Sequence, residues 1–250
     1  MKTVPNQRST KLNCHNAANS PIAQIAIMQP QADPFIVPVC DEQLGIVYQD
    51  EHLLLVNKPS KLLSLSGKHP LNKDSLHWRL VKQFPTATLL HRLDFGTSGL
   101  LIIALNKQVN GHITQQFQAR SVFKTYVALL HGHVPDDIGH VDMPIAKNRD
   151  QFPLQKICYE TGKSAVTHYE VVERLQKPYA SRVIFKPESG RTHQLRIHSR
   201  EMGYPILGCD LYASDEAYLL AERLMLHAER IEFDHPVSGE RMKGYCPCPF

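Results

Sequence analysis

The chain has 250 residues, of which 42% are hydrophobic and 21% are charged. This composition excludes a disordered chain, a collagen and a disulfide-dense miniprotein, and the length suffices for one or two domains with a buried core. The 28 basic and 24 acidic residues give a net charge of +4, which permits a nucleic-acid partner without requiring one. The six cysteines are scattered, which favours a cytoplasmic protein. Because the sequence has no run of about eighteen apolar residues, we expect no membrane span.

The first forty residues differ in composition from the rest. They hold three basic residues, one acidic residue and five of the 17 prolines. A segment of this kind buries too little apolar surface to offset the entropy of ordering it. We therefore expect residues 1–40 to form a disordered or loosely attached tail, and residues 41–250 to form the folded domain.

The rest of the chain shows the periodicity of short helices and strands. Strands are predicted at residues 52–59, 99–105, 123–131, 163–173 and 180–186. Helices are predicted at residues 76–84, 107–120 and 214–226. Asp74 or Ser75 would cap the first helix, and Ser214 the last. Because helices and strands are interspersed without a steady βαβ rhythm, we predict an α+β fold with a mixed or antiparallel sheet.

A first polar cluster, His91–Gly99, lies directly before the second predicted strand. Its glycines, threonine and serine favour a tight turn with available backbone N–H groups. His91, Arg92 and Asp94 bring an imidazole, a guanidinium and a carboxylate together within four residues. Catalytic groups are often carried on loops of this kind. An ordinary turn in which Asp94 caps its own backbone explains these residues equally well.

A second polar cluster is Gly190–Arg200. Thr192 is expected to cap a helix here, after the flexible glycine. On that helix His193, Arg196 and Arg200 would share one face, because they are three and four residues apart. A basic stripe suits phosphate binding or a carboxylate partner. The alternative is a solvated basic face.

Motifs for cofactors are missing from the sequence. Neither glycine-rich phosphate-binding pattern of the nucleotide-binding proteins occurs. Cys246-Pro247-Cys248 lacks the spacing of a zinc site and has no second cysteine pair to complete one. We therefore expect no metal and no nucleotide cofactor.

Several segments, in chain order, resemble the motifs of the RluA-type pseudouridine synthases. They are Asn57-Lys58-Pro59, His91–Asp94 with Thr97–Gly99, Lys124–Ala128, Gly190–His198, Pro205–Gly208 and Leu226–Ala228. The resemblance covers residues 41–250 and implies a pseudouridine synthase catalytic domain, with a mixed, largely antiparallel central sheet flanked by helices and loops. Cys158–Ala165 and Tyr169–Glu173 are similar to the subgroup that modifies both large-subunit (23S) ribosomal RNA and the tRNA anticodon stem-loop.

The resemblance implies an isomerase that converts uridine within RNA to pseudouridine without a cofactor. Asp94 matches the catalytic aspartate of the family, Arg196 the arginine that keeps it ionised, and Tyr126 the tyrosine that stacks near the target base. A base inside folded RNA cannot reach a buried aspartate, so it must be flipped out. Arg92 resembles the family arginine that enters the RNA in its place.

Further residues are expected around the bound nucleotide. Leu195 and Ile197 would wall the uracil pocket, with His91 and His193 as further substrate-binding residues. The candidate phosphate contacts are Lys58, Lys124, Arg191 and Arg200. A solvent-exposed charge is an equally good explanation of each of these four. The expected partner is a ribosomal or transfer RNA stem-loop, bound by a monomer.

Two functions of other classes compete with this one. An RNA-binding protein without catalysis would not require Asp94, Tyr126 and Arg196 together. A metal-dependent nuclease would need clustered acidic ligands, and Asp94 has no acidic neighbour in its motif. Insensitivity to a chelator would separate the synthase from the nuclease.

Overall fold

A computed structural model describes residues 36–250 of the chain. The helices are α1 (Leu76–Val81), α2 (Lys107–Gln118), α3 (Gln194–Glu201) and α4 (Asp215–Leu219). The strands are β1 (Gly45–Gln49), β2 (Leu53–Lys58), β3 (Thr88–Leu89), β4 (Ser98–Ala104), β5 (Phe123–His131), β6 (Ile138–Asp142), β7 (Ile145–Lys147), β8 (Gln155–Ile157), β9 (Val166–Leu175), β10 (Ala180–Pro187), β11 (Leu226–Asp234) and β12 (Arg241–Tyr245).

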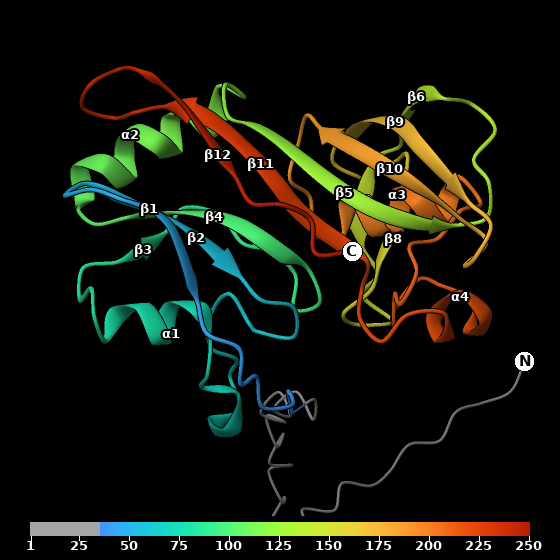
Figure 1. Cartoon of the computed structure of the whole chain (residues 1–250), viewed down its shortest axis with the longest axis horizontal. Helices are drawn as coiled ribbons and strands as arrows, with labels where there is room; N and C mark the ends of the chain where they lie inside the picture. The colour runs from blue at the N-terminus through green and yellow to red at the C-terminus, as the bar shows by residue number, and fades with distance from the viewer. Residues whose placement is uncertain (1–35) are drawn as a thin grey trace, which may run out of the picture. The chain divides into compact units, whose positions relative to one another are not determined.

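One long sheet organises the described part of the chain. Its strand order is β1-β2-β4-β11-β5-β10-β9-β6, with β12 paired to β11 and β3 paired to β4. β4 and β11 run parallel, and every other pair in the sheet is antiparallel. Figure 1 shows β11 and β12 passing between the strands on the β2 side and those on the β9 side. The predicted α+β class, with a mixed and largely antiparallel sheet, is confirmed.

β2 and β4 are buried on both faces, which explains their continuous apolar runs. Leu54 and Val56 of β2 pack in one cluster with α1, whereas Leu53 and Leu55 pack in another with α2. Residues of β4 alternate between the same two clusters, and Figure 1 places the two helices on opposite sides of these strands. Successive side chains of a strand point to opposite faces, so a doubly covered strand needs apolar residues at every position.

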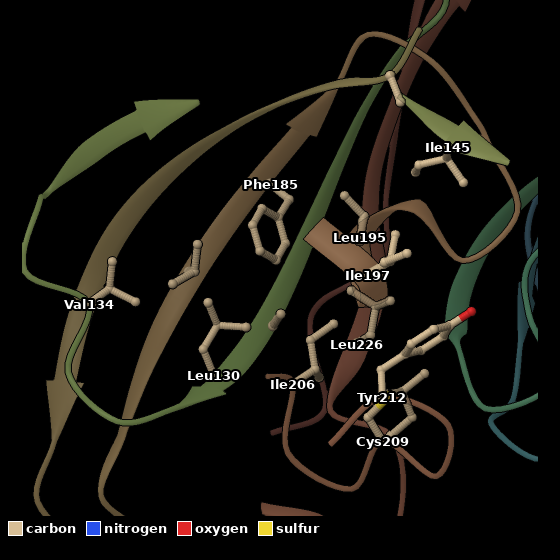
Figure 2. Packing of buried hydrophobic residues seen from close by; sticks show 14 residues of the cluster. Leu130, Val134, Ile145, Phe185, Leu195, Ile197, Ile206, Cys209, Tyr212 and Leu226 are labelled. Carbon is tan, nitrogen blue, oxygen red and sulfur yellow. The ribbon is translucent and has the colours of Figure 1, made fainter. Parts of the chain in front are cut away.

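A third cluster forms around α3 and the strands beyond β11. Figure 2 shows Leu195 and Ile197 of α3 among Phe185 of β10 and Leu226 of β11. Tyr212 and Cys209 lie at one edge of this cluster, in the loop between α3 and α4. The helix that carries Arg196 is therefore fixed to the sheet by its apolar side.

Glycine permits a close approach between the two parallel strands. Gly99 of β4 lies opposite Ala228 of β11 and has a backbone φ of +113°. A Cβ atom built at Gly99 would lie 2.3 Å from the Ala228 carbonyl oxygen. The joint between the two halves of the sheet therefore depends on a residue without a side chain.

The predicted helix at residues 214–226 is wrong over most of its length. Ser214 caps α4 as expected, since its Oγ accepts a hydrogen bond from the Ala217 N–H. The helix ends at Leu219, however, and Leu226 already begins β11. Met225 instead hydrogen-bonds through its backbone to Leu129 and Leu207, and Leu226 pairs with Ala128 of β5, so tertiary contacts override the local helical pattern. The other predicted helices and strands are confirmed, with ends shifted by up to three residues.

The predicted tail at residues 1–40 falls mostly outside the described residues. Its last five residues are described, and they contact the domain. The Val37 N–H donates to Asn72 Oδ1 at 2.9 Å, Cys40 is buried, and the Arg79 guanidinium donates to the Cys40 carbonyl. Contacts of the folded domain therefore begin before residue 41.

Within residues 36–250, every helix is too short or too polar to cross a membrane.

Candidate active site

A large cleft and a small inner pocket share one set of lining residues. The cleft has a volume of about 1270 Å³, and the inner pocket has a volume of about 90 Å³. The residues common to both are Arg92, Leu93, Asp94, Lys124, Tyr126, Ser189, Gly190 and Arg191. The inner pocket adds His193, Leu195 and Arg196 of the second polar cluster. The two clusters singled out in the sequence, about a hundred residues apart, therefore meet at one site.

The turn that carries Asp94 is held by the loop after β2. Ser60 Oγ donates to the Gly96 carbonyl at 2.6 Å, and Ser64 Oγ donates to the Leu93 carbonyl at 2.7 Å. The Thr97 N–H donates to the Asp94 carbonyl at 3.1 Å. The backbone of Asp94 closes the turn, and its carboxylate is left to face the pocket. The alternative in which this carboxylate caps its own backbone does not fit the structure.

Lys58 lies beneath this turn and is fully buried. Its Nζ donates to the carbonyls of Pro59 at 2.8 Å, Leu62 at 2.7 Å and Phe95 at 3.4 Å. The expectation that Lys58 contacts a phosphate is therefore wrong, because all three donors are directed at backbone carbonyls. Burial lowers the pKa of Lys58 to about 7, against the opposing effect of the Asp94 charge.

We expect Lys58→Met to lower the free energy of unfolding by about 2 kcal/mol, because buried carbonyls lose their donors. The folded pKa of about 7 lies below the ordinary value of 10.5, so the unfolded chain binds more protons between these pH values. The stability of the wild type relative to the variant should therefore rise with pH across this window. Urea unfolding at pH 7, 8 and 9 measures both effects, with Lys68→Met on the exposed surface as control. An equal stability loss in the two variants would contradict the assignment.

Arg196 is buried, and its guanidinium meets three groups. Nη1 lies 3.8 Å from Asp94 Oδ2, Nε donates to Cys209 Sγ at 3.3 Å, and Nη2 is hydrogen-bonded to Asp210. Burial lowers the pKa of Arg196, but Cys209, Asp94 and Asp210 outweigh it and hold the pKa above its ordinary value. For Arg196 the alternative of a solvated basic face is thereby excluded, and the expected carboxylate partner is present.

The start of α3 differs from the prediction. Thr192 does not cap the helix: His193 is the N-cap residue, with a left-handed φ of 57° and no capping side chain. The side chain of Gln194 holds the loop before the helix instead, since its Oε1 accepts hydrogen bonds from the Arg191 N–H at 3.0 Å and from Ser189 Oγ at 2.8 Å. A long amide at the first helical position reaches back to the loop, so the shorter threonine is not needed.

His193 is oriented by Tyr212. The Gln155 N–H donates to the Tyr212 hydroxyl at 2.8 Å, so the phenolic hydrogen is available to His193 Nδ1, also at 2.8 Å. Burial lowers the pKa of His193, although the Asp94 charge opposes it. The imidazole of His193 is therefore held at the pocket by the Tyr212 hydroxyl.

Tyr126 of β5 lines both the cleft and the inner pocket. Its ring is partly buried and packs against two of the core clusters. Burial raises the pKa of Tyr126, and the charge of Asp94 adds to the effect. A neutral phenol is therefore presented next to the carboxylate.

His91 has a structural contact that the sequence did not reveal. Its Nε2 accepts a hydrogen bond from the Ile102 N–H at 3.1 Å, and its ring packs 5.1 Å from the ring of Phe117. Burial lowers the pKa of His91 to about 3, and nearby Lys124 contributes. His91 lines the cleft, but its basic nitrogen is already used to anchor the turn to β4.

The remaining predicted residues divide into those at the site and those away from it. Arg92 is exposed at the pocket, and Leu195 lines its wall. Ile197 is fully buried in the core and belongs to neither lining, so the expectation that it walls the pocket is wrong. Arg200 also lies outside both linings, and its Nε donates to Glu201 at 2.8 Å.

Two predicted phosphate contacts lie on the shared lining of cleft and pocket. Burial lowers the pKa of Lys124, and Arg191 Nε donates to the Ser164 carbonyl at 3.0 Å. Sequence reasoning missed Tyr212 and Asp210, which lie in a loop outside both linings and contact His193 and Arg196, respectively. The one feature of the sequence that could have indicated them is that both are polar residues in the otherwise apolar stretch after Gly208.

Within residues 36–250 the structure has no group of three or more His, Cys, Asp or Glu side chains arranged to hold a metal ion.

Comparisons with known proteins agree with this geometry. A family model described as RNA pseudouridylate synthase matches residues 52–201. The dual-specificity RNA pseudouridine synthase RluA of Escherichia coli (strain K12) is 45% identical over 213 residues, which cover 85% of this chain and 97% of that protein. The protein of the same name from Yersinia pestis is 45% identical over 205 residues, covering 82% and 99%.

Among solved structures, human RNA pseudouridylate synthase domain containing 1 has a TM-score of 0.73 and 33% identity, over 85% of this chain and 86% of that chain. The family model spans more than half of the sequence, and both of its polar clusters fall inside the match. The chain thus belongs to the RNA pseudouridylate synthase family, and it is an isomerase.

Proposed function

We propose that the protein converts specific uridines to pseudouridine both in large-subunit ribosomal RNA and in the tRNA anticodon stem-loop. The observation that carries the proposal is the Asp94 carboxylate, placed with Tyr126 and Arg196 in a small pocket at a large cleft. The relatives named dual-specificity synthases match over nearly their whole length, which supports the two RNA classes.

The volumes of the two cavities suit a flipped nucleotide. The inner pocket, at about 90 Å³, takes a single base, whereas the cleft, at about 1270 Å³, accepts the neighbouring nucleotides. Exposed Arg92 lies next to the pocket and can stack in the gap that the base leaves. Flipping costs roughly a few kcal/mol, which contacts of the cleft with the RNA backbone would offset.

Each side chain in the pocket has a separate role in the reaction. The bond from C1′ of the ribose to N1 of uracil breaks, the base turns, and a bond from C1′ to C5 forms. The hydrogen on C5 leaves as a proton, and N1 takes up a proton, so the product is an isomer of the substrate. Asp94 is the group that reacts with the nucleotide, and the buried Arg196 guanidinium lies 3.8 Å from its carboxylate. Tyr126 stacks against the base, while Leu195 supplies an apolar wall that retains it during the turn.

Release of tritium from RNA labelled at C5 of uridine tests the proposal. We expect release from both a tRNA anticodon stem-loop and a large-subunit ribosomal RNA fragment, at unchanged rates with chelator present. Release from one RNA alone would remove the dual specificity. Binding of both RNAs without release from either would favour the alternative of RNA binding without catalysis, and loss of activity with chelator would favour a metal-dependent enzyme.

A further inference from the structure

Arg196 is shared between two carboxylates that differ in their surroundings. Asp94 belongs to the inner pocket and its side chain is 27% exposed, whereas Asp210 is 60% exposed and lines neither the pocket nor the cleft. The Arg196 side chain itself is only 5% exposed. Its direct hydrogen bond goes to Asp210, and its contact with Asp94 is the longer ion pair of 3.8 Å.

Three residues of one short loop segment, Cys209–Tyr212, contact this guanidinium. Cys209 Sγ accepts from Nε, Asp210 accepts from Nη2, and the Tyr212 ring lies 5.3 Å from the guanidinium carbon. The chain just before this segment is attached to the sheet, since the Leu207 N–H donates to the Leu129 carbonyl at 2.9 Å and Ile206 forms a β-bridge with Leu130. With Nε and Nη2 fixed in this way, Nη1 is the corner of the guanidinium that remains for Asp94.

The reaction makes this division of contacts significant. When Asp94 bonds to the nucleotide or takes up a proton, it gives up its negative charge. A buried arginine without any counter-ion is strongly unfavourable. If Asp94 were the only counter-ion of Arg196, the loss of its charge would therefore raise the free energy of the reacting state. A second carboxylate that does not take part in the reaction keeps Arg196 paired, and so removes this free-energy cost.

We infer that Asp210 is a positioning residue that serves as the standing counter-ion of Arg196, so that Asp94 can lose its charge during the reaction. The inference rests on the proposed catalytic role of Asp94. Asp210 acts only through Arg196, because it contacts neither cavity. It should therefore affect the rate of the chemical step and leave the affinity for RNA unchanged.

The kinetic test compares Asp210→Asn, Asp210→Glu and Asp150→Asn in the full chain. Asparagine keeps the size of the side chain and removes the charge, glutamate restores the charge, and Asp150 is an exposed acid outside the cleft. In the tritium assay we expect Asp210→Asn to lower kcat at least about tenfold with KM within about twofold. Asp210→Glu should recover most of this loss, and Asp150→Asn should match the wild type. A normal kcat in Asp210→Asn, or a change in KM alone, would overturn the inference.

A second test does not depend on turnover. Thermal unfolding is compared for the wild type, Asp94→Asn, Asp210→Asn and the double variant. Either carboxylate alone still pairs with Arg196, so each single variant should lose little. The double variant leaves the buried cation unpaired, and its Tm should fall by at least about 3 °C more than the sum of the single changes. Additive changes would overturn the role of Asp210 as counter-ion, whereas an absence of tritium release from the wild type would count against the proposed function only.

Discussion

Asp94→Asn is expected to lower turnover on uridine-containing RNA at least about 10⁴-fold, while RNA affinity changes less than about tenfold. Asparagine keeps the shape of the side chain and removes the charge that the reaction requires. The hydrogen bonds that hold the turn come from backbone groups of residues 93–97, so the pocket should keep its form. Single-turnover tritium release, together with a filter-binding titration of the same RNA, separates chemistry from binding.

The control for Asp94→Asn is Asp150→Asn, which makes the same change of charge on an exposed loop. It should retain wild-type turnover. If Asp94→Asn retained more than about a tenth of wild-type activity, another group would have to supply the reacting carboxylate. A parallel loss of RNA binding would instead indicate that Asp94 shapes the cleft.

Gly99→Ala is expected to lower the free energy of unfolding by at least about 3 kcal/mol. Two causes act together at this position. A φ of +113° is strained for any residue with a Cβ atom, and that atom would lie 2.3 Å from the Ala228 carbonyl oxygen and 2.6 Å from the Ala228 nitrogen. Backbone cannot move aside as a flexible side chain can, so the joint between β4 and β11 must open. Urea unfolding measures the loss.

Gly111→Ala is the matched control for Gly99→Ala. Gly111 lies inside α2, and a Cβ atom there would meet nothing within 4 Å. Because alanine favours a helix, this variant should gain roughly 0.5–1 kcal/mol. A similar small effect at both glycines would show that the close approach of the two strands has no energetic weight.

The sequence predicts well those features that depend on local pattern. Residues 53–56 of β2 and 100–104 of β4 are continuously apolar because α1 and α2 cover opposite faces of these strands. The family resemblance predicts that Asp94, Arg92 and Tyr126 lie together, and all three line the inner pocket. The structure adds the reason why motifs so distant in the chain meet, namely that β4 and β5 both border β11.

Contacts made by partners far along the chain could not be predicted. The sequence around Lys58 does not show that its ammonium group is buried. The carbonyls of Leu62 and Phe95, which accept its hydrogen bonds, are known only from the structure. Arg196 lies on what looks like a basic helix face, and its burial depends on the separate segment that holds Asp210. Residues 220–226 continue a helical pattern, but the tertiary contacts of Met225 and Leu226 decide the outcome. In each case the decisive interaction is non-local.

The central position of β11 ties catalysis to the order in which the ribosome makes the chain. β11 is among the last strands to be synthesised, yet it separates β4, which follows the Asp94 turn, from β5, which carries Tyr126. Until residues 226–234 have emerged, β4 and β5 each present an open edge, and such edges favour aggregation. Insertion of β11 closes both edges and completes the pocket in the same step, so a nascent chain cannot modify RNA before almost the whole domain has been translated.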